Sequence, residues 1–364
     1  MGCCAAAGMT VGFGGIVSCI RSGAPLSGVD AEQLKGLLIA DAHAHPNRLY
    51  GSRNPDPTSP TTEMMKQLGM AASSFSAVGD AVKYGGRSGP GMLPYNDTMG
   101  QLGEVRQLAE RKEVQLILKA PDIQSLIASH ETPGAIMAIE GGDALEGKIG
   151  NLDSFYDYGV RMITVMHDHN NEIGFNQRSQ SDGPLTPFGK KVVEKMNECG
   201  MLVDVAHSKT GTLKSVMEVS GAPVVDSHTS LLPGKASSPT RLRTWSELEL
   251  IAKSGGVVCT WPFAYSHATG RRRTLRDWAE EIVLMKSRLG MEHCGFGTDG
   301  GGHLPETVKG WESIASLPRL IEAMREVGLS REDIAAYAGG NFLRILHKSL
   351  GGTRPRIGTF DRFS

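Results

Sequence analysis

Short apolar runs recur along the chain, and each has the length of a buried β-strand. Most are continuous rather than alternating, which is typical of parallel strands that are covered on both faces. Eight runs can be placed, over residues 37–43, 73–79, 135–141, 161–167, 201–207, 223–228, 256–261 and 293–299. The segments between them carry helical patterns. Eight alternations of strand and helix predict an α/β fold, a (β/α)8 TIM-like barrel rather than an open doubly wound sheet.

Two of the predicted helices have clear limits. Residues 187–199 begin with Pro187, end before Gly200 and place their apolar side chains on one face. Residues 275–289 form a longer amphipathic pattern. No G-x-G-x-x-G follows the first apolar run, so a dinucleotide-binding fold loses its main support.

Capping boxes mark two further helix starts. Thr244 precedes a predicted helix over residues 245–253 and has Glu247 three positions on. Ser330 and Asp333 repeat this spacing before a C-terminal helical stretch. In this pattern the hydroxyl and the carboxylate satisfy each other's backbone amides, which favours a helix beginning at these positions.

The distribution of polar and apolar segments divides the chain into three parts. We expect the barrel to occupy residues 31–350, after a signal-like or disordered leader over 1–30 and before a tail over 351–364. Residues 45–65 and 83–98 are polar and rich in Pro, Gly and Ser. They predict long loops over the C-terminal face of the barrel.

The N-terminal segment carries no charged side chain before Arg21. It resembles the apolar region of a secretory signal, and the tetrapeptide ending at Cys19 resembles a bacterial lipobox. We therefore expect export to the periplasm or cell surface, with Cys19 as the candidate for a lipid anchor. No Lys or Arg precedes the apolar run, so a disordered leader is the alternative. Any membrane attachment is expected through this segment alone.

Charge and cysteine content exclude some classes of protein. The 38 basic and 39 acidic residues are mixed along the chain, giving a net charge of -1, so nothing indicates a nucleic-acid partner. Three of the six cysteines lie in the first twenty residues, so the spacing does not indicate a disulfide framework. We interpret Cys199, Cys259 and Cys294 as buried thiols.

Side chains that can bind a metal or move a proton stand at the ends of six apolar runs. They are His43 with His45, then Glu140, His167, His207, His228 and Asp299. In (β/α)8 barrels the chemistry gathers at the C-terminal ends of the strands. The pattern therefore predicts a metal centre at the mouth of the barrel.

Five of these side chains form a candidate ligand set. His43 and His45 are two positions apart and so point to the same side of a strand. Glu140 ends a buried run, where a carboxylate is costly unless it is paired or bound to metal, and His207 and His228 end consecutive runs. Nitrogen and carboxylate donors without Cys suit catalytic zinc. Since one catalytic zinc usually takes three protein ligands, we expect two zinc ions that share Glu140.

The other two side chains have less certain roles. Asp299 could be a weak ligand, the base that passes a proton from water to the leaving amine, or a capped turn residue. His167 could donate a hydrogen bond to a developing oxyanion or serve the structure alone. The remaining histidines, among them His169 and His303, are interpreted as surface or supporting residues.

Beyond this pattern, the chain resembles the membrane (renal) dipeptidase family of zinc peptidases over most of residues 37–348. The resemblance is carried by the segments AIEGGDAL, LTPFGKKVVEKMNECGMLVDVAHS, APVVDSHTS, GFGTDGGG and GGNFLRIL. It implies a TIM-like barrel with a binuclear zinc site. It also implies hydrolysis of dipeptides to free amino acids by a hydroxide that bridges the metals.

The resemblance also implies roles for individual residues. The implied metal ligands are His43, Glu140, His207 and His228, with Glu140 bridging the two metals. Asp299 would transfer the proton, and His167 would contact the substrate and the oxyanion. Arg241 falls where the family has an arginine that holds the substrate carboxylate, a role for which bidentate pairing is suited. Arg243 is close enough in sequence for that choice to stay open.

One position departs from the family pattern. The first motif of the family is His-x-Asp, and here it is His43-x-His45, which removes a negative charge from the site. The alternative is therefore an amidohydrolase that acts on another amide, a cyclic amide or a lactone. A non-catalytic barrel that serves binding is a third, weaker hypothesis. Neither the native metal, zinc or otherwise, nor the formation of a homodimer follows from the sequence.

Overall fold

The structure is a computed structural model. It describes residues 33–48, 56, 58–84, 92–129, 131–232, 241–267 and 270–351. The predicted leader with Cys19, parts of both predicted loops and the tail beyond residue 351 lie outside the described residues. Within the described residues, no helix is long and apolar enough to cross a membrane.

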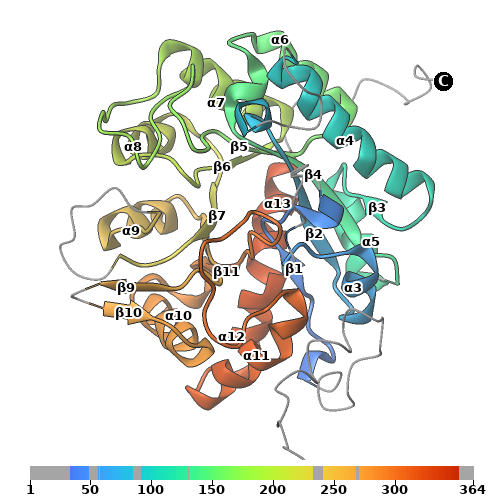
Figure 1. Cartoon of the computed structure of the whole chain (residues 1–364), viewed down its shortest axis with the longest axis vertical. Coiled ribbons are helices and arrows are strands. Elements are labelled where there is room, and N and C mark those ends of the chain that lie inside the picture. Colours follow the sequence, from blue (N-terminus) through green and yellow to red (C-terminus); the bar gives the residue numbers. More distant parts are fainter. Residues whose placement is uncertain are drawn as a thin grey trace, which may run out of the picture.

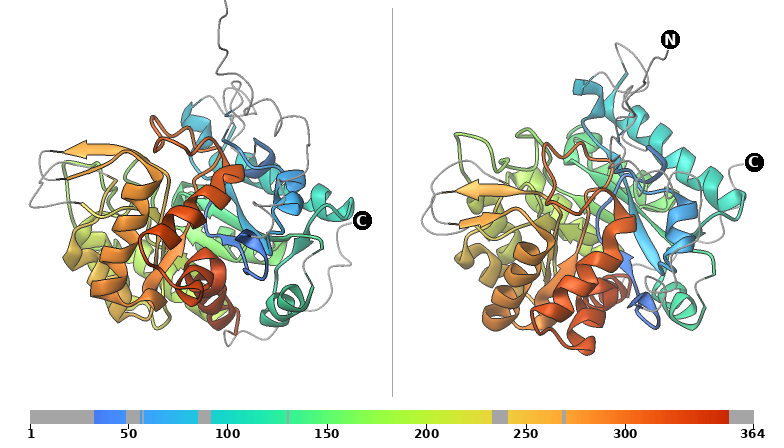
Figure 2. Two further views of the ribbon diagram at one scale, coloured as in Figure 1. Left: turned by 90° about the horizontal axis from the view of Figure 1, so that it is seen from below. Right: turned by 60° about the horizontal axis from the view of Figure 1, so that its bottom comes forward.

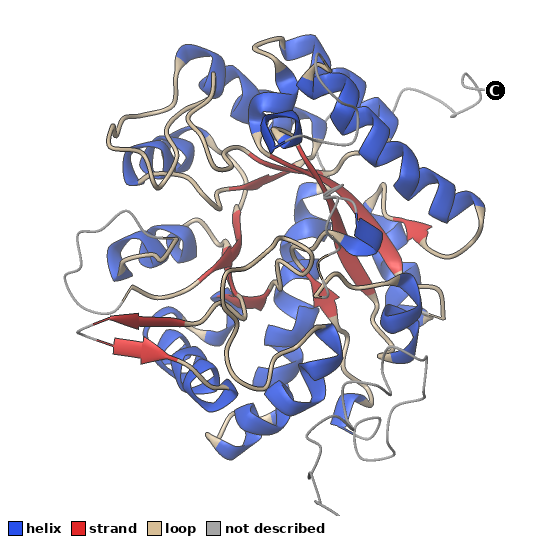
Figure 3. Ribbon diagram, viewed as in Figure 1, coloured by secondary structure: helices blue, strands red, loops and turns tan. Residues whose placement is uncertain are grey.

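A ring of parallel strands surrounded by helices forms the body of the protein (Figures 1 and 3). Its strands are β1 (Ala40–Asp41), β2 (Ala72–Val78), β4 (Gly134–Glu140), β5 (Met162–Thr164), β6 (Leu202–Asp204), β7 (Val225–Thr229), β8 (Val257–Thr260) and β11 (Cys294–Phe296). They are paired in that order. The two ends meet through a parallel bridge between Ala44 and Gly300 and a 3.0 Å bond from the Ala42 amide to the Phe296 carbonyl. This is the (β/α)8 TIM-like barrel that the sequence predicts.

Each of the eight predicted strands is present, but several are shorter than the apolar runs. Residues 201–207, for example, contain only three residues of β6, and residues 161–167 three residues of β5. Beyond these points the chain leaves the ladder, and His207 adopts a left-handed backbone with φ of 61°. The apolar runs thus continue into the turns that carry the polar side chains.

The helices surround the strands on the outside (Figures 1 and 2). They are α3 (Thr62–Gln67), α4 (Pro94–Glu110), α5 (Ala120–Ala128), α6 (Ile149–Tyr158), α7 (Pro187–Cys199), α8 (Thr210–Val219), α9 (Trp245–Lys253), α10 (Leu275–Leu289), α11 (Leu317–Glu326), α12 (Arg331–Ala335) and α13 (Asn341–Ser349). Short 3-10 helices are η1 (Pro46–Arg48), η2 (Ala81–Tyr84), η3 (Gly142–Leu145), η4 (Met291–His293) and η5 (Ile314–Ser316). The limits of α7, α9 and α10 agree with the predicted ranges.

The predicted caps are also present. Both capping boxes form, Thr244 with Glu247 before α9 and Ser330 with Asp333 before α12. The two predicted loops are shorter than expected, because α3 already begins at Thr62 and α4 at Pro94.

Two short elements lie outside the eight-stranded ring. Strand β3 (Gln115–Leu116) pairs with the start of β4, whereas β5 pairs with its end. Strands β9 (Tyr265–His267) and β10 (Gly270–Arg272) form an antiparallel pair that extends from the side of the barrel (Figure 2). Neither element has an apolar run long enough to be predicted from the sequence.

The C-terminal helical stretch is interrupted and closes one end of the barrel. A π-helical turn, η6 (Ala336–Gly340), separates α12 from α13. A side chain at Gly339 would lie 2.4 Å from both the Ala40 amide and the Leu38 carbonyl, so only glycine permits this approach to β1. The apolar side chains of α13 then pack against the first residues of several strands, such as Met162, Leu202 and Val257.

Candidate metal centre

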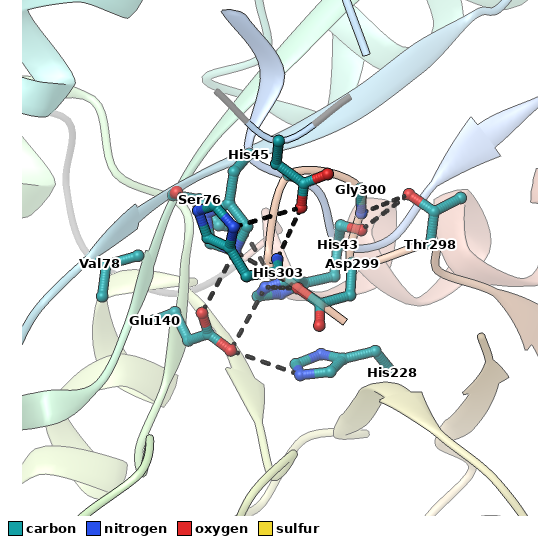
Figure 4. Close-up of polar contacts among 12 residues, drawn as sticks. His43, His45, Ser76, Val78, Glu140, His228, Thr298, Asp299, Gly300 and His303 are labelled. Carbon is teal, nitrogen blue, oxygen red and sulfur yellow. Dashed lines mark hydrogen bonds and ion pairs between the residues drawn. The ribbon is translucent and has the colours of Figure 1, made fainter. Parts of the chain in front are cut away.

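The opposite end of the barrel holds a cluster of buried ionisable side chains centred on Glu140, the last residue of β4 (Figure 4). Glu140 is followed by Gly141, whose φ of 102° belongs to the region that favours glycine. A side chain there would lie 3.1 Å from Cβ of His167. This turn allows the Glu140 carboxylate and the His167 ring to face the same space.

Both carboxylate oxygens of Glu140 lie among imidazole nitrogens. Its Oε1 is 2.9 Å from Nε2 of His207, and 3.4 Å from Nε2 of both His43 and His228. Its Oε2 is 3.3 Å from Nε2 of His45. The five side chains that the sequence singled out as ligands are therefore brought together.

These contacts divide into two groups of three with metal-binding geometry. His43, His45 and Glu140 form one group, and Glu140, His207 and His228 form the other. Glu140 is common to both, as expected for a carboxylate that uses one oxygen for each of two metals. Two further groups reach beyond these residues, to Asp204 and to His167 with Asp168.

The donor set fits divalent metal ions of the zinc type. Imidazole and carboxylate ligands without thiolate suit catalytic zinc. Nε2 of His43 is fully buried and has no hydrogen-bond partner among the described residues. Nε2 of His207 faces Nε2 of His228 at 3.0 Å. A buried nitrogen without a partner is costly unless something else occupies its lone pair.

Charges in this cluster are strongly coupled. Burial alone would lower the pKa of His45, but its hydrogen bonds with Asp299 and Glu140 outweigh burial and raise that pKa to about 10. Burial and the neighbouring His43 lower the pKa of His228 to about 4. The pKa of Glu140 lies well below its ordinary value despite burial, because of the surrounding imidazoles. The carboxylate therefore stays ionised at the centre of the site.

Asp299 and His167 border the same space from opposite strands. Oδ1 of Asp299 is 3.4 Å from Nε2 of His45, and Asp299 has a left-handed φ of 51°. Non-glycine residues in this region are often found where function requires a particular orientation. Nε2 of His167 is 3.6 Å from Oε2 of Glu140, so its ring also faces the cluster.

His167 is held by a residue that the sequence reasoning missed. Asp80, fully buried just beyond β2, lies 2.6 Å from Nδ1 of His167 and 3.3 Å from Nδ1 of the half-exposed His169. Burial opposes protonation of His167, but Glu140 and Asp80 outweigh it and raise the pKa of His167 to about 9. Asp80 follows an apolar run as the predicted ligands do, so the same signal could have found it.

A cavity of about 330 Å³ opens above the cluster. His45, Glu140, His167, His207 and Asp299 of the cluster line it. The rest of its wall is formed by Asp168, Arg178, Arg241, Trp261, Phe263, Gly302, His303, Leu304 and Pro305. Of these, only Arg241 was predicted as a site residue. Trp261 ends the predicted run 256–261, directly after β8, but was not singled out, and the others lie on loops where no periodic pattern marks them. His303, interpreted from sequence as a surface or supporting residue, lines the cavity.

Arg241 and Arg243 have different surroundings. Arg243 is enclosed by Asp226 at 2.7 Å and by the carbonyls of Val205 and Ser208. Arg241 lines the cavity and donates to Oε1 of Gln177 at 3.1 Å. Its second terminal nitrogen is buried without a hydrogen-bond partner among the described residues. Of these two arginines, Arg241 is therefore the one with a buried donor that no described residue binds and that a ligand in the cavity could accept.

Comparison with known proteins agrees with this architecture. The family model of membrane dipeptidases, peptidase family M19, matches residues 88–351. Dipeptidase aclJ of Aspergillus oryzae is 30% identical over 62% of this chain and 56% of its own length. Human dipeptidase 3 is 28% identical over 67% of this chain and 50% of its own. The chain thus spans about half the length of these relatives.

Solved structures show the same fold. The probable dipeptidase PvdM of Pseudomonas aeruginosa superposes with a TM-score of 0.75 at 18% identity, covering 88% of this chain and 98% of that one. A metallo peptidase of Rhodobacter sphaeroides, in complex with a phosphinate mimic of the dipeptide L-Ala-D-Ala, gives 0.72 at 20% identity, covering 86% and 99%. With the matched residues covering most of the barrel, the chain belongs to the membrane dipeptidase family, peptidase family M19.

Proposed function

We propose that this protein is a metal-dependent dipeptidase. The observation that carries the proposal is that two groups of candidate ligands sharing Glu140 border, through Glu140, His45 and His207, the same cavity as a buried arginine with a donor that no described residue binds. The family supports the same reaction. A cavity of about 330 Å³ has the size of a small-molecule site. The candidate ligands would face the scissile peptide bond, and Arg241 would face the C-terminal carboxylate of a dipeptide.

The first part of the proposal concerns the metals. His43 and His45 would hold one zinc ion and His207 and His228 the other, with Glu140 shared between them. Two bound divalent ions would polarise the scissile carbonyl and lower the pKa of water. His45 would act through Nε2, because its Nδ1 is 2.7 Å from the Ser76 carbonyl and can only donate a proton there. This contact supports His45 as a ligand through Nε2, although the resemblance implies a carboxylate at this position.

The second part concerns substrate binding. Arg241 would pair with the C-terminal carboxylate of the dipeptide, using the nitrogen that has no internal partner. Its guanidinium lies 5.2 Å from the ring centroid of Trp261, and Gln177 holds its other terminal nitrogen. Arg243 is excluded from this role because its own donors are taken up by Asp226 and backbone carbonyls.

The third part concerns proton transfer. Asp299, beside His45, would take a proton from the attacking water and deliver it to the leaving amine. His167 would donate from Nε2 to the developing oxyanion, because Asp80 occupies its Nδ1 and keeps the ring directed at the cavity. Both groups would act from positions that border Glu140 without displacing the five ligands.

The proposal is tested by incubating the zinc-loaded protein with L-Ala-L-Ala and measuring the free alanine that hydrolysis releases. We expect turnover that a chelator abolishes and zinc restores. The C-terminal amide of the same dipeptide should react far more slowly, since it lacks the charge that Arg241 binds. Arg241→Met should lower kcat/KM for the free dipeptide by about 10- to 100-fold, the value of a charged hydrogen bond.

The opposite outcome would favour the other amidohydrolase reaction. If a panel of dipeptides is not hydrolysed while a lactone or a cyclic amide is, the dipeptidase proposal fails. Several further features stay predictions: zinc as the native metal, two ions per chain, export, anchoring at Cys19 and dimer formation. Each can be measured on the purified protein.

A further inference from the structure

One group of potential metal ligands, formed by His43, Asp204 and His228, does not belong to the two groups around Glu140. It lies on the Nδ1 side of the two rings, away from the cavity. The hydroxyl of Ser227 lies among its members, 2.6 Å from Oδ2 of Asp204, 2.9 Å from Nδ1 of His228 and 3.3 Å from Nδ1 of His43. All four residues are fully buried. This arrangement is a hydrogen-bond network rather than a further metal site.

The Asp204 carboxylate can only accept hydrogen bonds in this network. Its Oδ1 receives the backbone amides of Ala206 and Ser227, each at 3.0 Å. Its Oδ2 receives the hydroxyls of Thr164 and Ser227, each at 2.6 Å. An ionised carboxylate has about four acceptor positions, and all four are filled. The single hydrogen of the Ser227 hydroxyl is therefore committed to Asp204.

Ser227 consequently has only lone pairs to offer the two histidines. A hydroxyl has one donor and two acceptor positions, and the donor is already used. His228 must then carry its proton on Nδ1 and donate it to Ser227 in the 2.9 Å bond. A proton on Nδ1 of His43 is favoured for the same reason. In a neutral imidazole a proton on Nδ1 leaves a lone pair on Nε2. Both Nε2 atoms face Glu140, at 3.4 Å.

We propose that Ser227, oriented by Asp204, is a positioning residue that fixes the metal-binding tautomer of one histidine in each of the two zinc sites. The inference rests on the proposed metal centre and adds to it a physical link between the two ions. Hydrogen bonds to the far nitrogen of a ligand histidine are worth about 10- to 100-fold in metal affinity. Here one hydroxyl serves two ligands.

The two histidines depend on Ser227 to different degrees. His43 has a second hydroxyl neighbour, Ser76, with Oγ at 3.4 Å from its Nδ1. His228 has no other Nδ1 partner among the described residues. Loss of Ser227 should therefore weaken the site that contains His228 more than the site that contains His43.

The inference is tested by measuring zinc affinities, in a titration of the zinc-loaded enzyme with a chelator of known affinity. In Ser227→Ala we expect one of the two zinc ions to be bound about 10- to 100-fold more weakly, with a smaller loss for the other. Ser74→Ala is the matched control. It removes a buried hydroxyl from β2 that contacts no histidine, and it should leave both affinities within about twofold of the wild type.

Asp204→Asn allows a double-variant comparison of zinc affinities, whose result a general structural role of Ser227 would not explain. If Asp204 acts through Ser227, the losses of zinc affinity in Asp204→Asn and Ser227→Ala should not add in the double variant. Unchanged affinities in Ser227→Ala, or fully additive losses, would overturn the inference while leaving the metal centre intact. Wild-type protein that binds no zinc would instead overturn the metal centre, and the role of Ser227 with it.

Discussion

The two ends of the barrel are built from the same strands but have opposite chemistry. At one end the first residues of the strands pack against apolar side chains of α13, such as Phe342 and Leu346. At the other end, ionisable residues in the last part of a strand or just beyond it surround Glu140. In barrels of this kind the strand starts stabilise the fold and the C-terminal ends of the strands hold the chemistry, and the proposed site here follows that division.

The polar end has an energetic cost that the apolar end does not have. Burial of apolar side chains stabilises the folded state, whereas buried charges need partners to offset the loss of solvation. His207 and Asp299 also adopt left-handed backbone conformations, which cost free energy in non-glycine residues. We therefore expect substitutions at the two ends to have different consequences.

The largest effect is expected at the centre of the polar end. Glu140→Gln removes the carboxylate common to both ligand groups. Dipeptide turnover should fall by more than about 1,000-fold, beyond the 10- to 100-fold typical of residues that merely orient ligands. Elemental analysis should find neither zinc site filled, while far-UV circular dichroism stays that of the wild type. Retention of two zinc ions would contradict the sharing of Glu140.

At the apolar end the effect should be on stability. Phe342→Ala leaves a cavity against the strand starts, and it should lower the free energy of unfolding by about 3–5 kcal/mol in chemical denaturation. Turnover per folded molecule should be unchanged. The control is Leu284→Ala on α10, where the side chain is 53% exposed, so a change within about 0.5 kcal/mol is expected. A large loss of specific activity in Phe342→Ala would show that the two ends are not independent.

A substitution of Asp80 should distinguish an effect on catalysis from an effect on metal binding at the polar end. Asp80→Asn weakens the orientation of His167, so kcat should fall roughly 100-fold. Zinc affinity should hardly change, because Asp80 contacts none of the five ligands. His169→Gln, which alters the weaker of the two histidine contacts of Asp80, should change kcat by less than about threefold. Equal losses of kcat in the two variants would contradict a specific role for His167.

The smallest expected step is the change in zinc affinity over one pH unit, about tenfold. In the metal-free protein, burial opposes protonation of His45, but Asp299 and Glu140 raise the pKa of His45 to about 10. A zinc ligand must be unprotonated, so binding below this pH displaces a proton. Zinc affinity should therefore fall about tenfold for each unit by which pH decreases between 9 and 6. A pH-independent affinity would show that His45 is not a ligand.

Sequence patterns could predict much of the site because of one geometric rule. Parallel strands of a barrel end at the same face, so His43, Glu140, His207, His228 and Asp299 could be brought together before their contacts were known. Asp80 follows β2 in the same way and was recognisable in principle. Arg178 and Phe263 also line the cavity, but they lie on loops. Loops have no periodic pattern, so the sequence could not place these side chains at the site.

By itself, the sequence determined the barrel, the order of its strands, the limits of α7, α9 and α10 and the set of candidate ligands. Local periodicity and capping encode these features because they depend on residues close in the chain. Only the tertiary structure decided between Arg241 and Arg243 as the arginine with a free donor, and placed Ser227 between His43 and His228. Such choices depend on the partners that distant segments supply, since a buried donor or acceptor takes its role from what lies within hydrogen-bond distance.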